Sequence, residues 1–263
     1  MPILLAILIV SGAVPIGRAI WANRGTSLLH ALVWAMIAWL MWGVAFLCDD
    51  LEGAAVQPVR YCALCLTGCA GVAVLGARRP HVFAWNFVVL CLFAVMGWPL
   101  VETQIIGTKT FDGLRIVFTA GTLAVGILNY LPTRLAPVAF LLLMVGGGEI
   151  ALLFAPAWLP GAAVFLDLLL TTVPWLAWAC FNRRDVFRAD FDRLWLDFRD
   201  RWGLVWSQRV REQFNHAADH AGWHVKLNWR GLRKTDASEQ DEKKWIDLLR
   251  SVLQRFIEPD QNW

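Results

Sequence analysis

The sequence predicts an all-α, polytopic membrane protein: a bundle of about seven transmembrane helices followed by an amphipathic, mainly helical cytoplasmic tail. Two features of the composition support this prediction. Of the 263 residues, 58% are hydrophobic and only 17% are charged, whereas soluble domains carry about 25% charged residues. The charges are also unevenly distributed, because residues 1–181 hold only 8 of the 24 Lys and Arg and 7 of the 21 Asp and Glu. We therefore expect a transmembrane domain at 1–181 and a tail domain at 182–263.

Seven apolar segments in the first domain are long enough to cross about 30 Å of hydrocarbon, which takes roughly 17–25 helical residues. They are Ile3–Ile20, Leu28–Leu47, Val59–Ala77, Val82–Pro99, Leu114–Leu131, Ala136–Phe154 and Gly161–Phe181. The first segment, which is rich in small residues near its end, could alternatively be a signal peptide. It lacks the basic start of a signal peptide, however, because its first cation is Arg18, behind the apolar run. We therefore interpret it as a true span.

The charges between the apolar segments predict an N-terminus outside the cell and a C-terminus in the cytoplasm, in the plasma membrane. With this orientation, most of the arginines fall in inner loops, at positions 18, 24, 78, 79, 134, 183 and 184. The outer loops hold most of the acids, at positions 49, 50, 52, 102 and 112, together with three exceptional cations, Arg60, Lys109 and Arg115. The opposite orientation would leave nearly all of the arginine outside.

Two acids interrupt the last two apolar segments. Glu149 follows three consecutive glycines, and Asp167 lies in the next segment after a short connection. A charged residue at the centre of a membrane helix costs about 2.5–3.5 kcal/mol on insertion scales and usually faces the interior of the bundle. Because the connection is short, the two helices should be antiparallel neighbours. We therefore expect both carboxylates at a similar depth and within reach of each other.

A polar stripe on the fifth segment supplies the other candidate residues of this interior. Arg115, Thr119, Thr122 and Asn129 follow one another at helical spacing along this segment. Thr171 of the seventh segment is a further candidate, because it shares a helical face with Asp167. In one interpretation, Arg115 pairs with Glu149 or Asp167 and the threonines bond to their own helices, so that the whole set is structural. In the other, these residues line a polar cavity that opens outward. Two carboxylates that repel each other there would bind a proton, a cation or a small cationic solute.

Nothing in the sequence marks a catalytic residue or a cofactor. No serine stands in GxSxG, and the HExxH, P-loop and GxGxxG patterns are absent. Cys62, Cys65 and Cys69 share one helical face, but the single CxxC lacks a second pair, so we expect small packing residues there. Cys48 and Cys62 both fall at predicted outer helix ends, where a disulfide is an open alternative.

The tail shows three patterns. In residues 185–221, apolar residues recur at the spacing of a long amphipathic helix, which Gly203 could kink. In residues 223–230, apolar and polar residues alternate, as in a strand or an extended segment on the membrane. A polar linker at 234–242 then precedes a final amphipathic helix at 245–257. His216, His220 and His224 are four residues apart, which makes them weak candidates for a metal site. Gly222 should end the helix before the third of them.

The protein has 16 tryptophans, and those of the tail suggest that its apolar faces rest on the inner leaflet, on the bundle or on a cytoplasmic protein partner. Such a partner would bind through residues 185–257. The net charge of +3 is too small to indicate nucleic acid. The leading hypothesis is a role in binding or transport. The alternatives are a membrane-anchored scaffold, in which the tail carries the function, and, third, a membrane-embedded enzyme.

Overall fold

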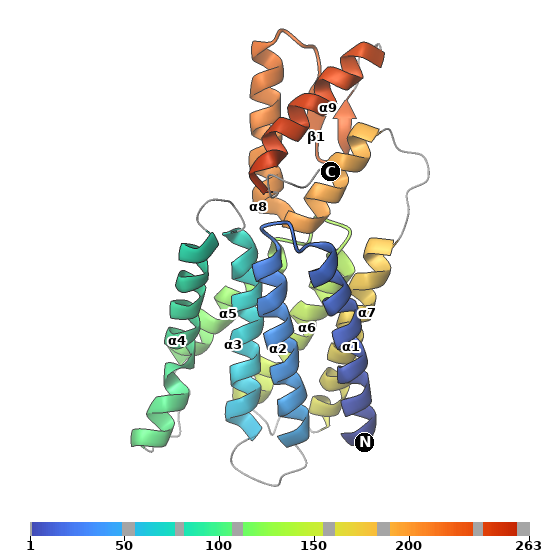
Figure 1. The fold of residues 1–263 in the computed structure, drawn as a ribbon. Coiled ribbons are helices and arrows are strands. Elements are labelled where there is room, and N and C mark those ends of the chain that lie inside the picture. The colour runs from blue at the N-terminus through green and yellow to red at the C-terminus, as the bar shows by residue number, and fades with distance from the viewer. Residues whose placement is uncertain are drawn as a thin grey trace.

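A computed structural model describes residues 2–48, 56–76, 82–106, 113–154, 161–182, 190–233 and 239–256 (Figure 1). The described chain is almost entirely helical. Its first part contains seven helices: α1 (Pro2–Ala22), α2 (Leu29–Cys48), α3 (Val56–Leu75), α4 (Val82–Ile106), α5 (Gly113–Leu128), α6 (Ala136–Phe154) and α7 (Ala162–Asn182). They run side by side, alternately up and down, and the tail stacks on one end of them. We call this end of the bundle the tail end and the opposite one the distal end.

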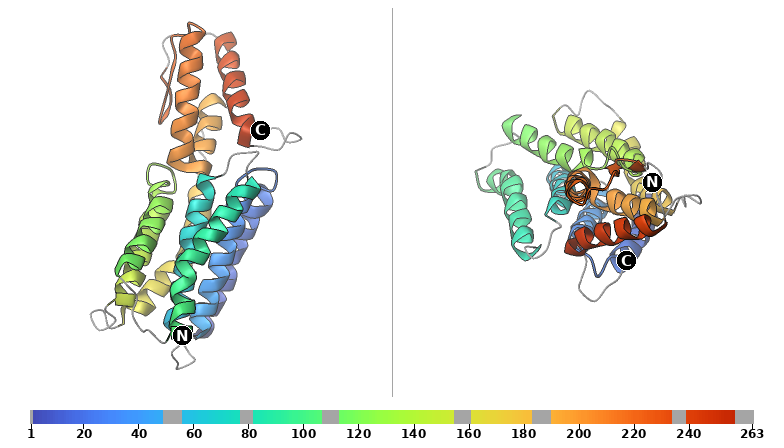
Figure 2. Two further views of the ribbon diagram at one scale, coloured as in Figure 1. Left: turned by 90° about the vertical axis from the view of Figure 1, so that its left-hand side faces the viewer. Right: turned by 90° about the horizontal axis from the view of Figure 1, so that it is seen from above.

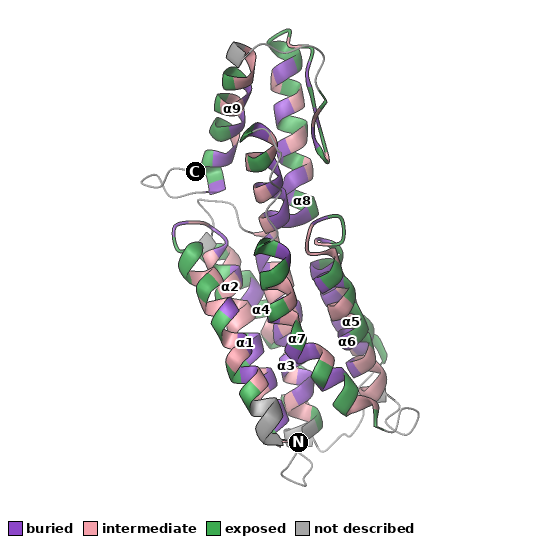
Figure 3. Cartoon of the chain, turned by 90° about the vertical axis from the view of Figure 1, so that its right-hand side faces the viewer, coloured by how far each residue is buried: buried purple, intermediate pink, exposed green. Residues whose placement is uncertain are grey.

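Five of these helices, α2, α3, α4, α6 and α7, are long and apolar enough to cross a membrane. The stretches Ile7–Ala22 of α1 and Gly113–Leu128 of α5 are also apolar but shorter than the five. The helices of the bundle carry many exposed residues (Figure 3). Large apolar side chains are among them, and Phe83, Leu114 and Val10 are at least 70% exposed. Such a surface suits lipid rather than water. The predicted class, a helical membrane protein, is supported, whereas seven crossings and the orientation stay predictions.

Six of the seven helices form a closed ring. Going round it, α1 packs on α2, α2 on α3, α3 on α5, α5 on α6, α6 on α7, and α7 on α1 again. Helix α4 lies outside the ring and packs on α3 and α5, as the view from above shows (Figure 2). The ring therefore has an interior, and the residues that face it are the natural candidates for function.

Glycines set the closest approach in the ring, between α3 and α5. A Cβ atom on Gly71 would lie 2.7 Å from the Cα of Gly126, so the two backbones touch here. Cys65 and Cys69 are fully buried on the same helix, which agrees with the packing role predicted for them. Cys48 and Cys62 are free thiols in the structure.

The tail folds as a small unit above the bundle. It comprises α8 (Asp190–His220), the antiparallel strands β1 (Lys226–Asn228) and β2 (Gly231–Arg233), α9 (Glu239–Leu253) and a short 3-10 helix η2 (Gln254–Phe256). The predicted kink is real, because Gly203 has φ 76° and ψ −166° within α8. The predicted single strand at 223–230 was wrong in extent: the chain turns after Asn228 and pairs with the next segment through Gly231, whose φ is 130°.

The apolar faces of the tail pack against each other. Aromatic rings of α8 form a stack that Phe256 closes from the side, with Phe198 and Trp202 only 4.9 Å apart between ring centroids. Trp206 donates a hydrogen bond to the Val74 carbonyl of the bundle (3.1 Å), so the same stack also docks the tail. Several of the tail tryptophans that suggested contact with the leaflet or a partner are therefore buried in contacts within the chain itself.

Candidate functional site

Three charged side chains meet inside the ring, near the distal end. Arg60 lies in the second turn of α3, Asp167 in the second turn of α7, and Glu149 in the last third of α6. All three are buried, with side chains exposed by 9%, 4% and 3% respectively. They are thus withdrawn from water although they lie close to one end of the bundle.

One guanidinium holds both carboxylates. Nη2 of Arg60 lies 2.7 Å from each oxygen of Asp167, and its Nη1 lies 2.9 Å from Oδ1 of the same group. Nη1 also donates to Oε1 of Glu149 at 3.0 Å. Asp167 is therefore engaged through both of its oxygens, in the forked geometry that suits arginine. The ring of Phe46 lies 5.9 Å from the guanidinium carbon.

The glycine run before Glu149 helps to explain how the two acids come together. A Cβ on Gly148 would lie 2.7 Å from the side chain of Leu166, so α6 and α7 are in close contact one residue before each acid. A larger residue at 148 would displace the Leu166 side chain. The helix pair thus places Glu149 and Asp167 at a similar depth, and α3 brings Arg60 between them.

The balance of charge in this cluster is uneven. Among the residues that the structure describes in this cluster, Arg60 supplies one positive charge against two negative ones when both acids are ionised. Charges withdrawn from water are costly unless they are well paired and hydrogen-bonded. An excess of one negative charge in a buried cluster is the condition under which a proton or a cation binds.

Arg60 is the residue that the sequence analysis missed. We counted it as an exceptional cation of the outer side, although it is the second residue of the predicted span at 59–77. A cation at the same predicted depth as two intramembrane acids was the available signal.

The expected pairing of Arg115 with Glu149 or Asp167 was wrong. Arg115 instead forms an ion pair with Glu102 (2.6 Å), in which the side chains are 35% and 24% exposed. The reason is geometric: Arg115 begins α5, next to the end of α4 that carries Glu102.

The predicted threonines are buried but bond within their own helices. Thr119 donates to the carbonyl of Arg115, Thr122 to that of Phe118, and Thr171 to that of Leu168. Thr119 additionally contacts the hydroxyl of Tyr61 at 3.3 Å. None of these contacts reaches the charge cluster, so the structural interpretation fits the threonines best.

Asn129 belongs to the other end of the molecule. Its side chain accepts a hydrogen bond from the Val205 backbone (3.0 Å) and donates to the Trp202 carbonyl (3.3 Å), and its own carbonyl accepts from Leu204. It thus binds the kink of α8 at Gly203. The stripe on α5 runs from the distal end to the tail, which the helical spacing alone did not reveal.

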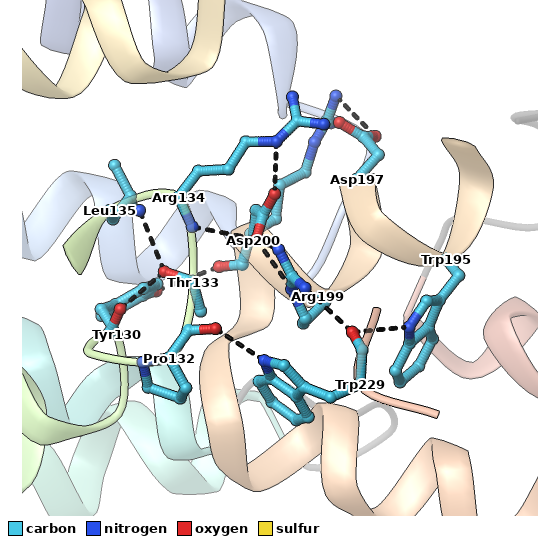
Figure 4. Close-up of polar contacts among 11 residues, drawn as sticks. Tyr130, Pro132, Thr133, Arg134, Leu135, Trp195, Asp197, Arg199, Asp200 and Trp229 are labelled. Carbon is cyan, nitrogen blue, oxygen red and sulfur yellow. Dashed lines mark hydrogen bonds and ion pairs between the residues drawn. The ribbon is translucent and has the colours of Figure 1, made fainter. Parts of the chain in front are cut away.

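Charged residues complete the junction between bundle and tail (Figure 4). Asp200, which is 1% exposed, pairs with Arg199 (2.7 Å) and with Arg134 (3.0 Å) of the α5–α6 turn. The indole of Trp229 donates to the Pro132 carbonyl at 2.7 Å. These contacts fix the tail on the bundle.

The three histidines do not assemble into a metal site. His216 and His220 lie on α8 with ring centroids 4.4 Å apart, but the helix ends at His220 and Gly222 turns the chain at φ 70°. Among the residues that the structure describes, no group of three or more His, Cys, Asp or Glu could hold a metal ion.

A partly open cavity of about 610 Å³ lies within the ring. It extends from the middle of the bundle to the tail end, and its walls are mainly apolar. None of the seven candidate residues named from the sequence lines it, and neither does Arg60. This cavity therefore differs from the expected polar, outward-opening one, and the charge cluster lies beyond its distal end.

The chain matches no known protein family, and comparison with curated proteins and with solved structures finds no similar one.

Proposed function

We propose that this membrane protein takes up a proton at the Arg60–Glu149–Asp167 cluster and uses it in binding or transport across the bundle. The observation that carries this proposal is the meeting of two buried carboxylates on one guanidinium. Among the ligands considered from the sequence, a proton fits this geometry best. The guanidinium already occupies the space between the carboxylates that a cationic solute would take, whereas a proton needs no space.

We assign the proton to Glu149. Both oxygens of Asp167 accept hydrogen bonds of 2.7–2.9 Å from the two terminal nitrogens of Arg60, and Oε1 of Glu149 accepts one from Nη1 at the longer distance of 3.0 Å. Charge-assisted, bidentate pairs are the stronger ones. The ionised form should therefore persist on Asp167, while Glu149 gains and loses the proton.

Proton uptake would change how three helices are joined. With Glu149 ionised, Arg60 ties α3 to both α6 and α7; with Glu149 neutral, its hold on α6 weakens while the pair with α7 remains. Because the cluster lies at the distal end of the ring, this change would loosen that end specifically. A proton could then enter or leave from the distal side.

Proton flux into liposomes that contain the purified protein and a pH-sensitive dye tests this function. Wild-type protein should carry protons down an imposed pH gradient, and Glu149→Gln should not. Glu102→Gln is the matched control, because Glu102 also pairs with an arginine at the distal end but is 24% exposed. Equal flux in wild type and Glu149→Gln, or wild-type flux no faster than that of empty liposomes, would reject the transport of protons by this cluster.

A cytoplasmic partner that binds residues 185–257 is the second proposal. It is favoured by the way the tail projects from the bundle as a folded unit (Figure 1). In this case a protein without residues 182–263 would lose function, while Glu149→Gln with Asp167→Asn would keep it. The opposite pattern would favour the proton.

A further inference from the structure

The cavity inside the ring has walls suited to an apolar chain. It measures about 610 Å³ and is lined by all six helices of the ring and by α8. Space exists because several lining residues are small, among them Ala31, Ala35 and Ala38 of α2 and Gly71 of α3. Cavities of this size and polarity are typical of sites for small molecules, which bury most of their surface in them.

The polar lining residues gather at the tail end. Those that carry charge, among the described lining residues, are Arg18 of α1 and the pair Asp197 and Arg201 of α8. Their charges add to one excess positive charge. Arg201 is already engaged, with Nη2 3.0 Å from Asp197 and Nη1 3.2 Å from the Asn23 side-chain oxygen. Arg18, in contrast, is exposed and forms no ion pair or hydrogen bond with the described part of the chain.

We propose that the cavity binds a single-chain amphiphile with an anionic headgroup, of the fatty-acid type. The chain would lie along the apolar walls toward the middle of the bundle, and the carboxylate would lie at the tail end beside Arg18 and Arg201. For a chain that enters from the bilayer, the apolar walls contribute van der Waals packing rather than burial from water, and arginine is well suited to bind a carboxylate. An uncharged amphiphile would gain only the first contribution, so the headgroup decides the preference.

This site is separate from the charge cluster and does not depend on proton uptake. The cavity lies at the tail half of the ring, and none of Arg60, Glu149 and Asp167 lines it. Glu149→Gln should therefore abolish proton flux and leave amphiphile binding unchanged. Failure of one proposal is thus distinguishable from failure of the other.

Native mass spectrometry of the full chain, released from nanodiscs of phosphatidylcholine after incubation with palmitate or with palmitamide, tests the proposal. Wild-type protein should retain one palmitate and bind it about tenfold more tightly than the neutral amide, a difference of about 1.4 kcal/mol. Arg18→Gln, a surface change that leaves folding intact, should lower the affinity for palmitate about tenfold and leave that for palmitamide unchanged.

A cavity-filling variant locates the chain. Ala35→Phe places a large ring on the cavity wall and should abolish binding of both amphiphiles, while Val33→Phe on the same helix is the matched control, because Val33 faces outward at 41% exposure. Equal affinity of wild type for palmitate and palmitamide would overturn the headgroup assignment. Unchanged binding in a folded Ala35→Phe, or in Arg18→Gln, would overturn the site itself.

Discussion

Both oxygens of the Asp167 carboxylate lie 2.7 Å from Nη2 of Arg60, in a bundle whose interior is otherwise mainly apolar. This contact ties α7 to α3, and Glu149 adds α6 to the same guanidinium. Helix α3 is therefore joined at one point to α6 and α7, which follow it much later in the chain. The charges that carry the proposed function also hold the distal end of the ring together, so the two roles need separate tests.

Removal of the arginine should destabilise the protein strongly. Arg60→Met leaves two buried carboxylates without their shared cation, which should lower the free energy of unfolding by about 3–5 kcal/mol. Adding Asp167→Asn should restore part of this loss, because one uncompensated charge disappears. Arg115→Met, in a partly exposed pair, is the control and should cost about 1 kcal/mol or less. Unfolding in micelles gives the stability of the wild type and of each variant. If the losses caused by Arg60→Met and Asp167→Asn simply added in the double variant, the pairing would be contradicted.

The contact between α3 and α5 should tolerate no side chain. Gly126→Ala places a Cβ 2.7 Å from the Cα of Gly71, and overpacking of this kind costs about 1–3 kcal/mol. Gly121→Ala, on the same helix with no atom within 4 Å of the new Cβ, should be neutral or stabilise by up to about 1 kcal/mol. Thermal unfolding in micelles compares them. Equal stability of the two variants would show that the helices do not touch as described.

The kink in α8 should require glycine for two reasons. Gly203 has a backbone conformation that other residues rarely adopt, which costs about 1–3 kcal/mol. A Cβ there would also collide with Asn129, including its carbonyl oxygen at 2.7 Å. Gly222, at φ 70° but with open space around it, is the matched control, and Gly222→Ala should cost only the backbone strain of about 1–2 kcal/mol. Denaturation of the purified protein in micelles measures both losses of stability, and a Gly203→Ala loss no larger than that of Gly222→Ala would reject the contact.

The junction between tail and bundle should depend on Asp200. Asp200→Asn weakens ion pairs to Arg199 and Arg134 and leaves the arginine at 199, which is 8% exposed, without its charge partner. Loss of one member of a buried pair costs about 3–5 kcal/mol, and the tail should then become accessible to protease. Asp197 lies one turn earlier and pairs with Arg201, and its side chain is 39% exposed. Asp197→Asn should therefore cost at most about 1 kcal/mol. Equal protease resistance in both variants would contradict this role of Asp200.

The helices could be predicted from sequence because hydropathy and length act locally. The predicted span Ala136–Phe154 coincides with α6, and the other helices of the bundle begin and end within a few residues of their predicted limits, apart from α4, which continues to Ile106. The proximity of Glu149 and Asp167 could also be predicted, because a short connection makes two consecutive helices pack as antiparallel neighbours. These inferences used only residues that are close in the chain.

The partner of the two acids could not be predicted in the same way. Which helix packs against α6 and α7 is decided by the order of helices round the ring, and this order depends on contacts such as Gly71 with Gly126. Spacing on one helix says which residues share a face but not which neighbour that face meets. Arg115 and Asn129 therefore seemed to belong with the acids, although one pairs with α4 and the other with the tail.

Infrared difference spectroscopy of the carboxyl C=O stretch, recorded while the pH is lowered from neutral to acid, tests the central claim most directly. The proposal predicts a protonated-carboxyl band in the wild type that titrates, disappears in Glu149→Gln and persists in Glu102→Gln. Absence of any such band from the folded wild type, or its survival in Glu149→Gln, would contradict proton uptake by Glu149 in this cluster.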